Sequence, residues 1–346
     1  MSIYDDIYKH FPTINEWSEP DEKVYLVISF FITASSLRII FCFFEIILEP
    51  YTYLGINTDK ELPAMVTKAF NHWYQVPRPA LDIILKIVGP THAASLLIDD
   101  IQDDSDLRKG KPVAHTVYGV AQTINTATYV VFDAYRNISK LTLFLKSPET
   151  TDLGSIIDDE IVALHRGQGK DLYWRDSLIC PTEEEYLRMI HNKTGAMFRL
   201  PIKLLQALSP VESLPDCFSL VNIIGILAQI QNDLLSLSRD FTEDKGFCED
   251  FSEGKFSFPI IHAVKADSSN SLLMDTLRSR PKDEATKRKA LRYMNDQTKS
   301  LDHAFDVICK LEKTAKEESE KLGGNPELSS ILELIHSPST PDIDDQ

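Results

Sequence analysis

Residues 91–112 read THAASLLIDDIQDDSDLRKGKP, an apolar helical run that ends in a dense group of carboxylates. Asp99 and Asp103 are four residues apart, so a helix places both on one face, with Asp100 beside them. Like charges packed this closely at the C-terminal end of a helix repel each other and oppose the helix dipole. Mg²⁺ would relieve that repulsion, because it takes oxygen ligands and is held by one or two carboxylates plus substrate phosphates. The stretch therefore predicts a metal site at a helix end.

The flanking residues suit a ligand with an apolar tail and a phosphate head. The apolar run ASLLI leads up to the aspartates and is expected to line a hydrophobic pocket. Arg108 and Lys109 follow the aspartates and supply donors for phosphate oxygens. A solvated acidic helix end is the alternative interpretation. The apolar approach, acidic cluster and basic loop occur together in order, which favours a functional site.

Composition narrows the class of protein. The chain has 346 residues, of which 43% are hydrophobic, so it can bury a sizeable core. A net charge of −16 repels nucleic acid, although an anionic substrate can still bind through bridging divalent cations. The five cysteines are scattered and form no C-x-x-C pair, which is typical of reduced thiols. We expect a cytoplasmic protein that does not bind nucleic acid.

Apolar residues at helical spacing dominate the chain, and strand-like alternation is scarce, so we predict an all-α, single-domain protein. Thr182 followed by three glutamates predicts a capping box and a helix start at Glu183. We expect an N-terminal extension over 1–45, a catalytic domain over 46–325 and a partly disordered tail over 326–346. Helices are expected at 24–48, 61–76, 80–104, 114–146, 150–169, 183–208, 214–239, 256–266, 285–297 and 300–322.

The N-terminal region contains the one segment of this sequence that resembles a membrane span. Met1–Lys23 is mixed and acidic, without the pattern of a signal peptide. Val24–Leu48 is strongly apolar and offers a route to membrane contact, but Arg38 and Glu45 interrupt it. A charge within a span costs a few kcal/mol, so we expect a buried or subunit-facing helix instead.

Several motifs closely resemble the geranylgeranyl diphosphate synthase family of trans-isoprenyl diphosphate synthases, above all its fungal members. They are DDIQD, LRKGKPVAH, LHRGQGKDLYWRD (164–176), NKTG (192–195) and KGFCEDFSEGKFSFPIIH (245–262). The resemblance spans about Ile46 to Glu320. It implies a helical bundle around a deep apolar cavity, about three Mg²⁺ ions holding a prenyl diphosphate, and a homodimer or larger assembly. It assigns Asp99, Asp100 and Asp103 to the first metal motif, and Arg108, Lys193, Gln229, Lys245 and Lys255 to diphosphate binding.

The second substrate pocket departs from that family. Its members bind isopentenyl diphosphate with a lysine, an arginine three residues later, a histidine and a further arginine. Here Lys60 and His72 are available, but Pro63 and Lys109 stand at the two arginine positions. Proline has no donor, and lysine cannot reproduce the bidentate fork of arginine. Each lost charge-assisted hydrogen bond is worth about 1.5–3 kcal/mol, so we predict an impaired pocket.

The second metal motif, QIQNDLLSLSRD (229–240), departs as well. The family pattern resembles QIRDDY, whereas Asn232, Ser236 and Asp240 match the (N/D)D-x-x-(S/T)-x-x-x-(E/D) pattern of class I terpene cyclases. We therefore predict a metal site made by these residues together with Asp233. Asp240 is expected to be the weakest ligand, because it lies about 80° around the helix from Asn232. Random decay of the motif, or a merely solvated helix face, is the alternative.

Small residues one turn before the first motif bear on substrate length. Ala94 and Ser95 resemble family positions where bulky aromatics stop the chain at C15, and small residues leave room for about C20. Tyr129, Phe132 and Phe198 are predicted to line the pocket and to stabilise a cation with their ring faces. Ordinary core packing is the alternative for such aromatics.

The sequence leaves three possible functions. The departures at Pro63, Lys109 and the second motif favour a Mg²⁺-dependent class I terpene cyclase acting on a C20 or C15 prenyl diphosphate. A working geranylgeranyl diphosphate synthase is the second interpretation. A non-catalytic subunit of a prenyl diphosphate synthase is the third, although a subunit without activity gains nothing from a crowded cluster of aspartates.

Overall fold

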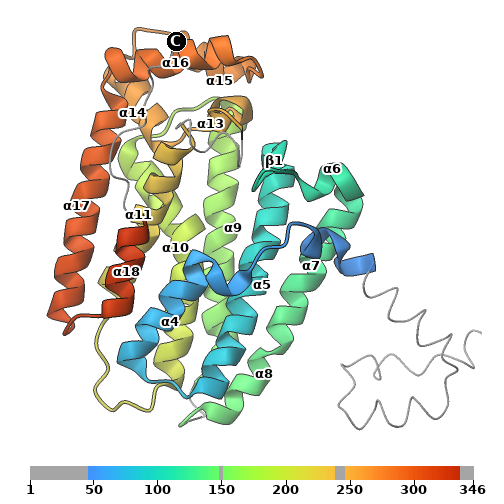
Figure 1. The fold of residues 1–346 in the computed structure, drawn as a ribbon, viewed down its shortest axis with the longest axis vertical. Helices are drawn as coiled ribbons and strands as arrows, with labels where there is room; N and C mark the ends of the chain where they lie inside the picture. Colours follow the sequence, from blue (N-terminus) through green and yellow to red (C-terminus); the bar gives the residue numbers. More distant parts are fainter. Residues whose placement is uncertain (1–45, 148–150, 238–245, 336–346) are drawn as a thin grey trace, which may run out of the picture. The chain divides into compact units, whose positions relative to one another are not determined.

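A computed structural model of the chain describes residues 46–147, 151–237 and 246–335. The described part from Pro50 onward forms one compact unit that is almost entirely helical (Figure 1). This confirms the predicted all-α bundle. The extension over 1–45, with nearly all of the Val24–Leu48 stretch, lies outside the described residues, as do Asp240, Lys245 and the tail from 336 onward.

The bundle is centred on α9 and α10, with the other helices around them. The elements that precede the centre are η2 (Thr58–Lys60), α4 (Leu62–Tyr74), α5 (Arg78–Asp103), α6 (Ala114–Tyr118), α7 (Val120–Arg136), α8 (Ile138–Leu141) and η3 (Thr142–Phe144). The centre and the remainder are α9 (Leu153–Ser177), α10 (Glu183–Leu208), α11 (Phe218–Leu235), α13 (Glu249–Glu253), α14 (Phe258–Ala266), α15 (Leu272–Ser279), α16 (Glu284–Asp296), α17 (Ser300–Lys321) and α18 (Pro326–Ile335).

Helix α10 is the centre of the packing and begins where the sequence predicts. The Thr182 hydroxyl accepts a hydrogen bond from the Glu185 N–H, and the Glu185 carboxylate accepts from the Thr182 N–H, which completes the capping box. The helix then packs against α9, α11, α4, α5 and α14. Side chains carried by α10 are therefore held from several sides.

Helix α9 approaches α10 closely because of a glycine. A Cβ atom added to Gly167 would lie 2.4 Å from the backbone nitrogen of Lys193 on α10. No side chain fits in that space. The close approach brings the polar face of α9 against the part of α10 that carries Lys193.

The structure differs from the predicted elements at several places: α9 runs to Ser177 instead of ending at 169, α13 and α15 were not predicted, and two further differences concern 114–146 and the C-terminal end. The segment 114–146, predicted as one helix, is divided into α6, α7, α8 and η3. Its first break is at Gly119, whose φ of +85° and ψ of 151° are incompatible with a helix. At the other end, Pro326–Ile335 forms α18 and buries Leu328 and Ile331, so the packed body continues past the expected boundary at 325.

A two-stranded hairpin is the one sheet among the described residues. Strand β1 (Leu107–Arg108) pairs antiparallel with β2 (Lys111–Pro112). Lys109 and Gly110 form the turn with φ values of +51° and +71°. The hairpin follows α5 directly and returns Arg108 toward the end of that helix.

The hydrophobic core runs the length of the bundle, and its largest buried side chains include Phe70, Tyr74, Tyr186 and Phe251.

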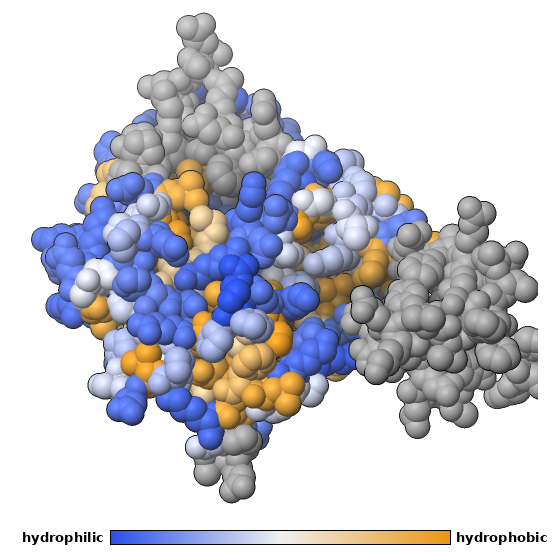
Figure 2. All heavy atoms as spheres, turned by 60° about the horizontal axis from the view of Figure 1, so that its bottom comes forward, coloured by the Kyte–Doolittle hydropathy of each residue, from blue (hydrophilic) through white to orange (hydrophobic). Residues whose placement is uncertain are grey.

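In the described part of the chain, α5 and α11 are long and apolar enough to cross a membrane by length and composition alone. About half of the apolar stretch in each of these helices is buried in the bundle. Figure 2 shows a face on which hydrophilic residues cover most of the described surface, with apolar residues in separate patches. The four described cysteines are free thiols.

Candidate active site

The first aspartate motif lies at the C-terminal end of α5, and its three carboxylates have different surroundings. Asp100 is 1% exposed and accepts a two-point ion pair from Arg108, whose Nε lies 2.8 Å from Oδ1. Burial lowers the pKa of Arg108, but the hydrogen bond and charge of Asp100 outweigh it, so the pKa is raised. Asp99 is the most open of the three, with 30% of its side chain exposed.

Helix α9 faces this motif with three polar residues at helical spacing. Gln168 donates to Asp99 Oδ1 over 3.2 Å, and Arg175 donates to Asp103 Oδ1 over 2.9 Å. Asp171 lies between them on the same face and accepts from Lys193 of α10. These residues belong to a stretch that marks the family resemblance, but they are not among the predicted site residues. Their i, i+3 and i+7 spacing was the signal that could have identified them.

Basic side chains complete this cluster. Lys193 Nζ lies 2.8 Å from Asp171 Oδ2 and 3.5 Å from Asp99 Oδ1. Burial lowers the pKa of Lys193, but Asp171 and then Asp99 outweigh it and raise the pKa. Lys255 also has a raised pKa, since the charges of Asp250 and other carboxylates outweigh its burial. Both lysines therefore stay charged.

The carboxylates of this cluster fit a hard divalent cation. Burial raises the pKa of Asp103 well above its ordinary value, and the charges of Asp99 and Glu253 raise it further. Such crowding of oxygen donors disfavours the charged forms, and a Mg²⁺ ion would reverse that effect. Asp99, Asp103 and Asp171 are the residues that would hold it.

The second motif lies at the C-terminal end of α11, and its described residues differ in their surroundings. Helix α11 ends at Leu235, and Ser236 is its C-cap. The Ser236 hydroxyl is buried and donates to Asp250 Oδ2 at 2.6 Å, with the carbonyl oxygen of Asp233 2.8 Å away. The role of Ser236 as a metal ligand stays a prediction. Asn232 is half-buried on the last turn of α11.

Asp233 is a buried hydrogen-bond acceptor in this structure, and its place among the metal ligands stays a prediction. One carboxylate oxygen accepts from the Tyr186 hydroxyl and from the N–H of Phe258, which is 2.9 Å away. The other accepts from Gln229 Nε2 at 2.8 Å. The pKa of Asp233 is raised to about 6. Burial is the largest cause of this shift; the charge of Lys255 opposes it and the charge of Asp250 adds to it. Asp233 thus joins α10, α11 and the start of α14. Gln229 in turn accepts a hydrogen bond from Thr194.

The predicted isopentenyl pocket is rearranged around a glutamate. Lys109 Nζ lies 2.6 Å from Glu61 Oε1, next to Lys60 at the end of η2. Pro63 is buried in the first turn of α4, where its missing N–H has no structural cost. A carboxylate thus neutralises the lysine that replaces the second arginine.

The structure places a second histidine, His92, in this region, while the role of His72 stays a prediction. His72 is exposed on α4, whereas His92 Nε2 lies 3.9 Å from Glu61 Oε2. Burial lowers the pKa of His92 to about 4, with Glu61 opposing that shift and Lys109 adding to it. The available signal was its position seven residues before Asp99, two turns earlier on the same helix face.

The predicted pocket residues separate into buried and exposed groups. Ala94 and Phe198 are buried, while Ser95 and Tyr129 are half-buried. Phe132 is different, because 65% of its surface is exposed on α7. In the single chain the Phe132 ring faces solvent, which does not support its predicted place in the pocket.

The chain is similar to known proteins over most of its length. A family model described as polyprenyl synthetase matches residues 44–294. "IDS-like terpene synthase 2" of Melampsora larici-populina is 87% identical, with 97% of this chain and 99% of the relative covered. "IDS-like terpene synthase 2" of Melampsora lini is 78% identical over the whole of both chains. "Geranylgeranyl pyrophosphate synthase" of Mucor circinelloides f. lusitanicus is 46% identical, with 86% of this chain and 95% of the relative covered.

Proposed function

The chain belongs to the polyprenyl synthetase family, and from that membership we propose that it is a terpene synthase of the isoprenyl diphosphate synthase-like type. It ionises a preformed C20 or C15 prenyl diphosphate and cyclises the resulting carbocation. The relatives that are 87% and 78% identical carry the matching name, which supports this choice over chain elongation.

One observation carries the proposal. Lys109, at the position of the second isopentenyl arginine, is engaged by Glu61 over 2.6 Å, and Pro63 occupies the position of the first. An incoming diphosphate would have to displace a carboxylate and would then meet one lysine where two guanidinium groups are expected. The pocket for the nucleophile of chain elongation is weakened, while the aspartate cluster is retained.

The retained cluster supports ionisation of an allylic diphosphate. Buried Arg108 and half-buried Lys193 and Lys255 are cations near the aspartates and would bind the phosphate oxygens of the substrate. Mg²⁺ held by Asp99, Asp103 and Asp171 would stabilise the charge that develops on the leaving diphosphate. The protein then needs an apolar and water-free environment for the cation, to which Ala94 and Phe198 are suited.

The proposal is tested by incubating purified protein with Mg²⁺ and a single prenyl diphosphate of C15 or C20 length. GC–MS should detect a cyclic hydrocarbon or alcohol without isopentenyl diphosphate. Asp99→Asn should abolish the product. Asp104→Asn is the matched control, because Asp104 is exposed at a φ of +55°, which asparagine tolerates. Failure to obtain a cyclic product from either substrate contradicts the proposal.

Chain elongation is the second candidate, favoured by the relative that is 46% identical and is named a geranylgeranyl pyrophosphate synthase. His92 and Lys60 remain near Glu61 and Lys109, so part of a second diphosphate pocket is present. Consumption of labelled isopentenyl diphosphate together with farnesyl diphosphate tests this candidate. Pro63→Arg should raise any such consumption if the pocket is limited by the missing guanidinium.

We further propose that the chain forms a homodimer through α7. Val120, Ile124 and Phe132 are 48%, 43% and 65% exposed and lie within a sector of about 120° around α7. Phe132→Asp should convert the dimer to a monomer in size-exclusion chromatography with light scattering. Leu334→Asp, at an equally exposed position of α18, should leave the assembly unchanged.

A further inference from the structure

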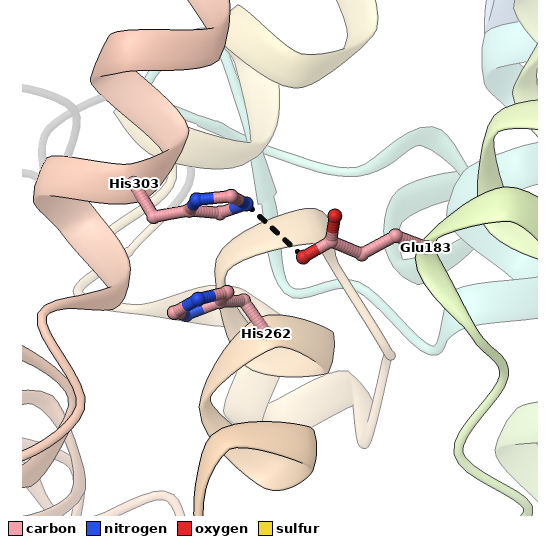
Figure 3. Close-up of side chains that lie close together, drawn as sticks. All are labelled: Glu183, His262 and His303. Atoms are coloured by element: carbon pink, nitrogen blue, oxygen red, sulfur yellow. Dashed lines mark ion pairs between the residues drawn. The ribbon is translucent and has the colours of Figure 1, made fainter.

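A second group of potential ligands lies outside the aspartate cluster. Glu183 from the first turn of α10 and His303 from α17 point toward each other, and the ring of His262 from α14 lies stacked beside that of His303 (Figure 3). Each offers one ligand atom, and these atoms all lie within 4.8 Å of one another. The group brings together three helices that are distant in the sequence.

Hydrogen bonds determine which nitrogen of His262 carries the proton. The Thr298 hydroxyl donates its only proton to the carbonyl oxygen of Met294. Ser300 Oγ, 2.7 Å from Thr298 Oγ1, must therefore donate to Thr298. His262 Nδ1, 2.8 Å from Ser300 Oγ, must then donate to Ser300, which leaves the lone pair on Nε2. Burial, and then His303, lower the pKa of His262, so the ring is neutral and able to bind a metal.

The second histidine has an unsatisfied nitrogen. His303 Nε2 is shielded from solvent and makes no hydrogen bond among the described residues. Glu183 Oε1 is only 3.1 Å away, but the alignment is not that of a hydrogen bond. The His303 ring is held in place by stacking, with its centroid 4.0 Å from that of His262 and 5.7 Å from that of Phe258. The His303 Nε2 atom is shielded from solvent, lies beside a carboxylate and makes no hydrogen bond within the described part of the chain. A bound cation would satisfy this nitrogen.

We infer that Glu183, His262 and His303 form a binding site for a divalent transition metal of the Zn²⁺ class. Two imidazoles and one carboxylate are ligands that suit Zn²⁺ rather than Mg²⁺, and a water would complete a tetrahedron. Ser300 orients His262 from behind, as the hydrogen-bond partners of metal-bound histidines do.

Binding requires a small adjustment. Zn²⁺ bonds of about 2.0–2.1 Å place tetrahedral ligands roughly 3.4 Å apart, so the most distant pair must approach by about 1–1.5 Å. The Glu183 side chain is 37% exposed and supplies that movement by rotation. The His303 ring, half-buried like that of His262, must also turn out of its stacked position, because the lone pairs of two nearly parallel rings cannot meet at one ion.

Two residues that donate hydrogen bonds to Asp233 lie one helical turn from this site. Tyr186 follows Glu183 on α10, and Phe258 precedes His262 on α14. Both donate to Asp233. A metal bound here would fix the ends of α10, α14 and α17 and thereby stabilise the support of Asp233.

The test uses metal-free full-length protein in excess Mg²⁺, which occupies the oxygen-rich site. Calorimetric titration with Zn²⁺ should give one strong site per chain, and Co²⁺ should give the intense visible absorption of a tetrahedral site with nitrogen ligands. Both signals should be lost in His303→Ala and in Glu183→Gln. His165→Ala is the matched control, because His165 is an exposed histidine of α9 that contacts only its own helix in the contacts described. Ser300→Ala should weaken binding roughly 10–100-fold while retaining all three ligands.

The melting temperature provides a readout independent of the ligands' spectra. Zn²⁺ should raise it by a few degrees in the original chain and in His165→Ala, but not in His303→Ala. Circular dichroism verifies that each variant is folded. Absence of Zn²⁺ binding overturns the inference and leaves an ion pair beside two stacked rings. Strong binding that persists in His303→Ala overturns it as well, because the metal is then held elsewhere.

Discussion

Replacing Gly167 by alanine tests the close packing on which the site depends. The new Cβ would lie 2.4 Å from Lys193 N and 2.8 Å from Lys193 Cα, whereas ordinary contacts begin at 3.4 Å. Backbone atoms cannot rotate away, so α9 must move about 1 Å from α10. Overpacking of this kind costs about 1–3 kcal/mol, and alanine returns about 1 kcal/mol of helix propensity. Because the clash is with backbone, we expect a net loss of about 1–2 kcal/mol.

Gly169 provides the matched control on the same helix. It is exposed, and a Cβ added there meets no atom within 4 Å. Gly169→Ala should therefore stabilise the protein by about 0.5–1 kcal/mol. Urea unfolding followed by far-UV circular dichroism measures both changes, and the two variants should have opposite signs. Equal stabilisation by both substitutions would refute the proposed close approach.

The same pair of variants separates packing from catalysis. A shift of α9 would carry Gln168 and Asp171 away from Asp99 and Lys193, with which they now bond. Gly167→Ala should therefore reduce turnover of a prenyl diphosphate as well as stability. Gly169→Ala should leave turnover unchanged.

Other substitutions test single interactions by urea unfolding. Tyr186→Phe removes a buried hydroxyl that donates to Asp233, and should cost about 1.5–3 kcal/mol. Thr182→Ala removes one half of the capping box with Glu185 and should cost about 1 kcal/mol. His92 has a pKa of about 4 in the fold and an ordinary value of 6.5, so the unfolded chain binds the extra proton between these values. The stability contributed by neutral His92 is present above pH 6.5 and is lost as the pH falls toward 4, by up to about 3 kcal/mol. His92→Gln should flatten that part of the pH profile, and an unchanged slope would contradict the assignment.

The helices were the most predictable part of the molecule, for local reasons. The bounds of α10 follow from the Thr182 cap and the apolar spacing after it, both of which act within a few residues. The break at Gly119 was missed because a single glycine can also lie inside a helix and does not by itself indicate where the helix ends. Its φ of +85° is imposed by the packing of α6 and α7, which the sequence does not display.

The site was predictable where its residues lie close together in sequence and not where it depends on tertiary contacts. Asp99, Asp100 and Asp103 share one helix end, so their clustering follows from spacing. His92 and His72 are both histidines on apolar helices, and only the fold shows which one faces Glu61. Ser236 matched a ligand pattern, but Asp250, fourteen residues later, returns to accept its proton.

The ion pair between Asp100 and Arg108 affects how mutagenesis of this motif should be interpreted. Arg108 belongs to β1, so Asp100 holds the hairpin against the end of α5. Alanine at Asp100 would leave a buried guanidinium without its partner and release the hairpin along with Lys109. A dead Asp100 variant is thus poor evidence that this carboxylate ever touches an ion. Paired replacement of Asp100 and Arg108 by uncharged residues would distinguish a lost ligand from a lost anchor.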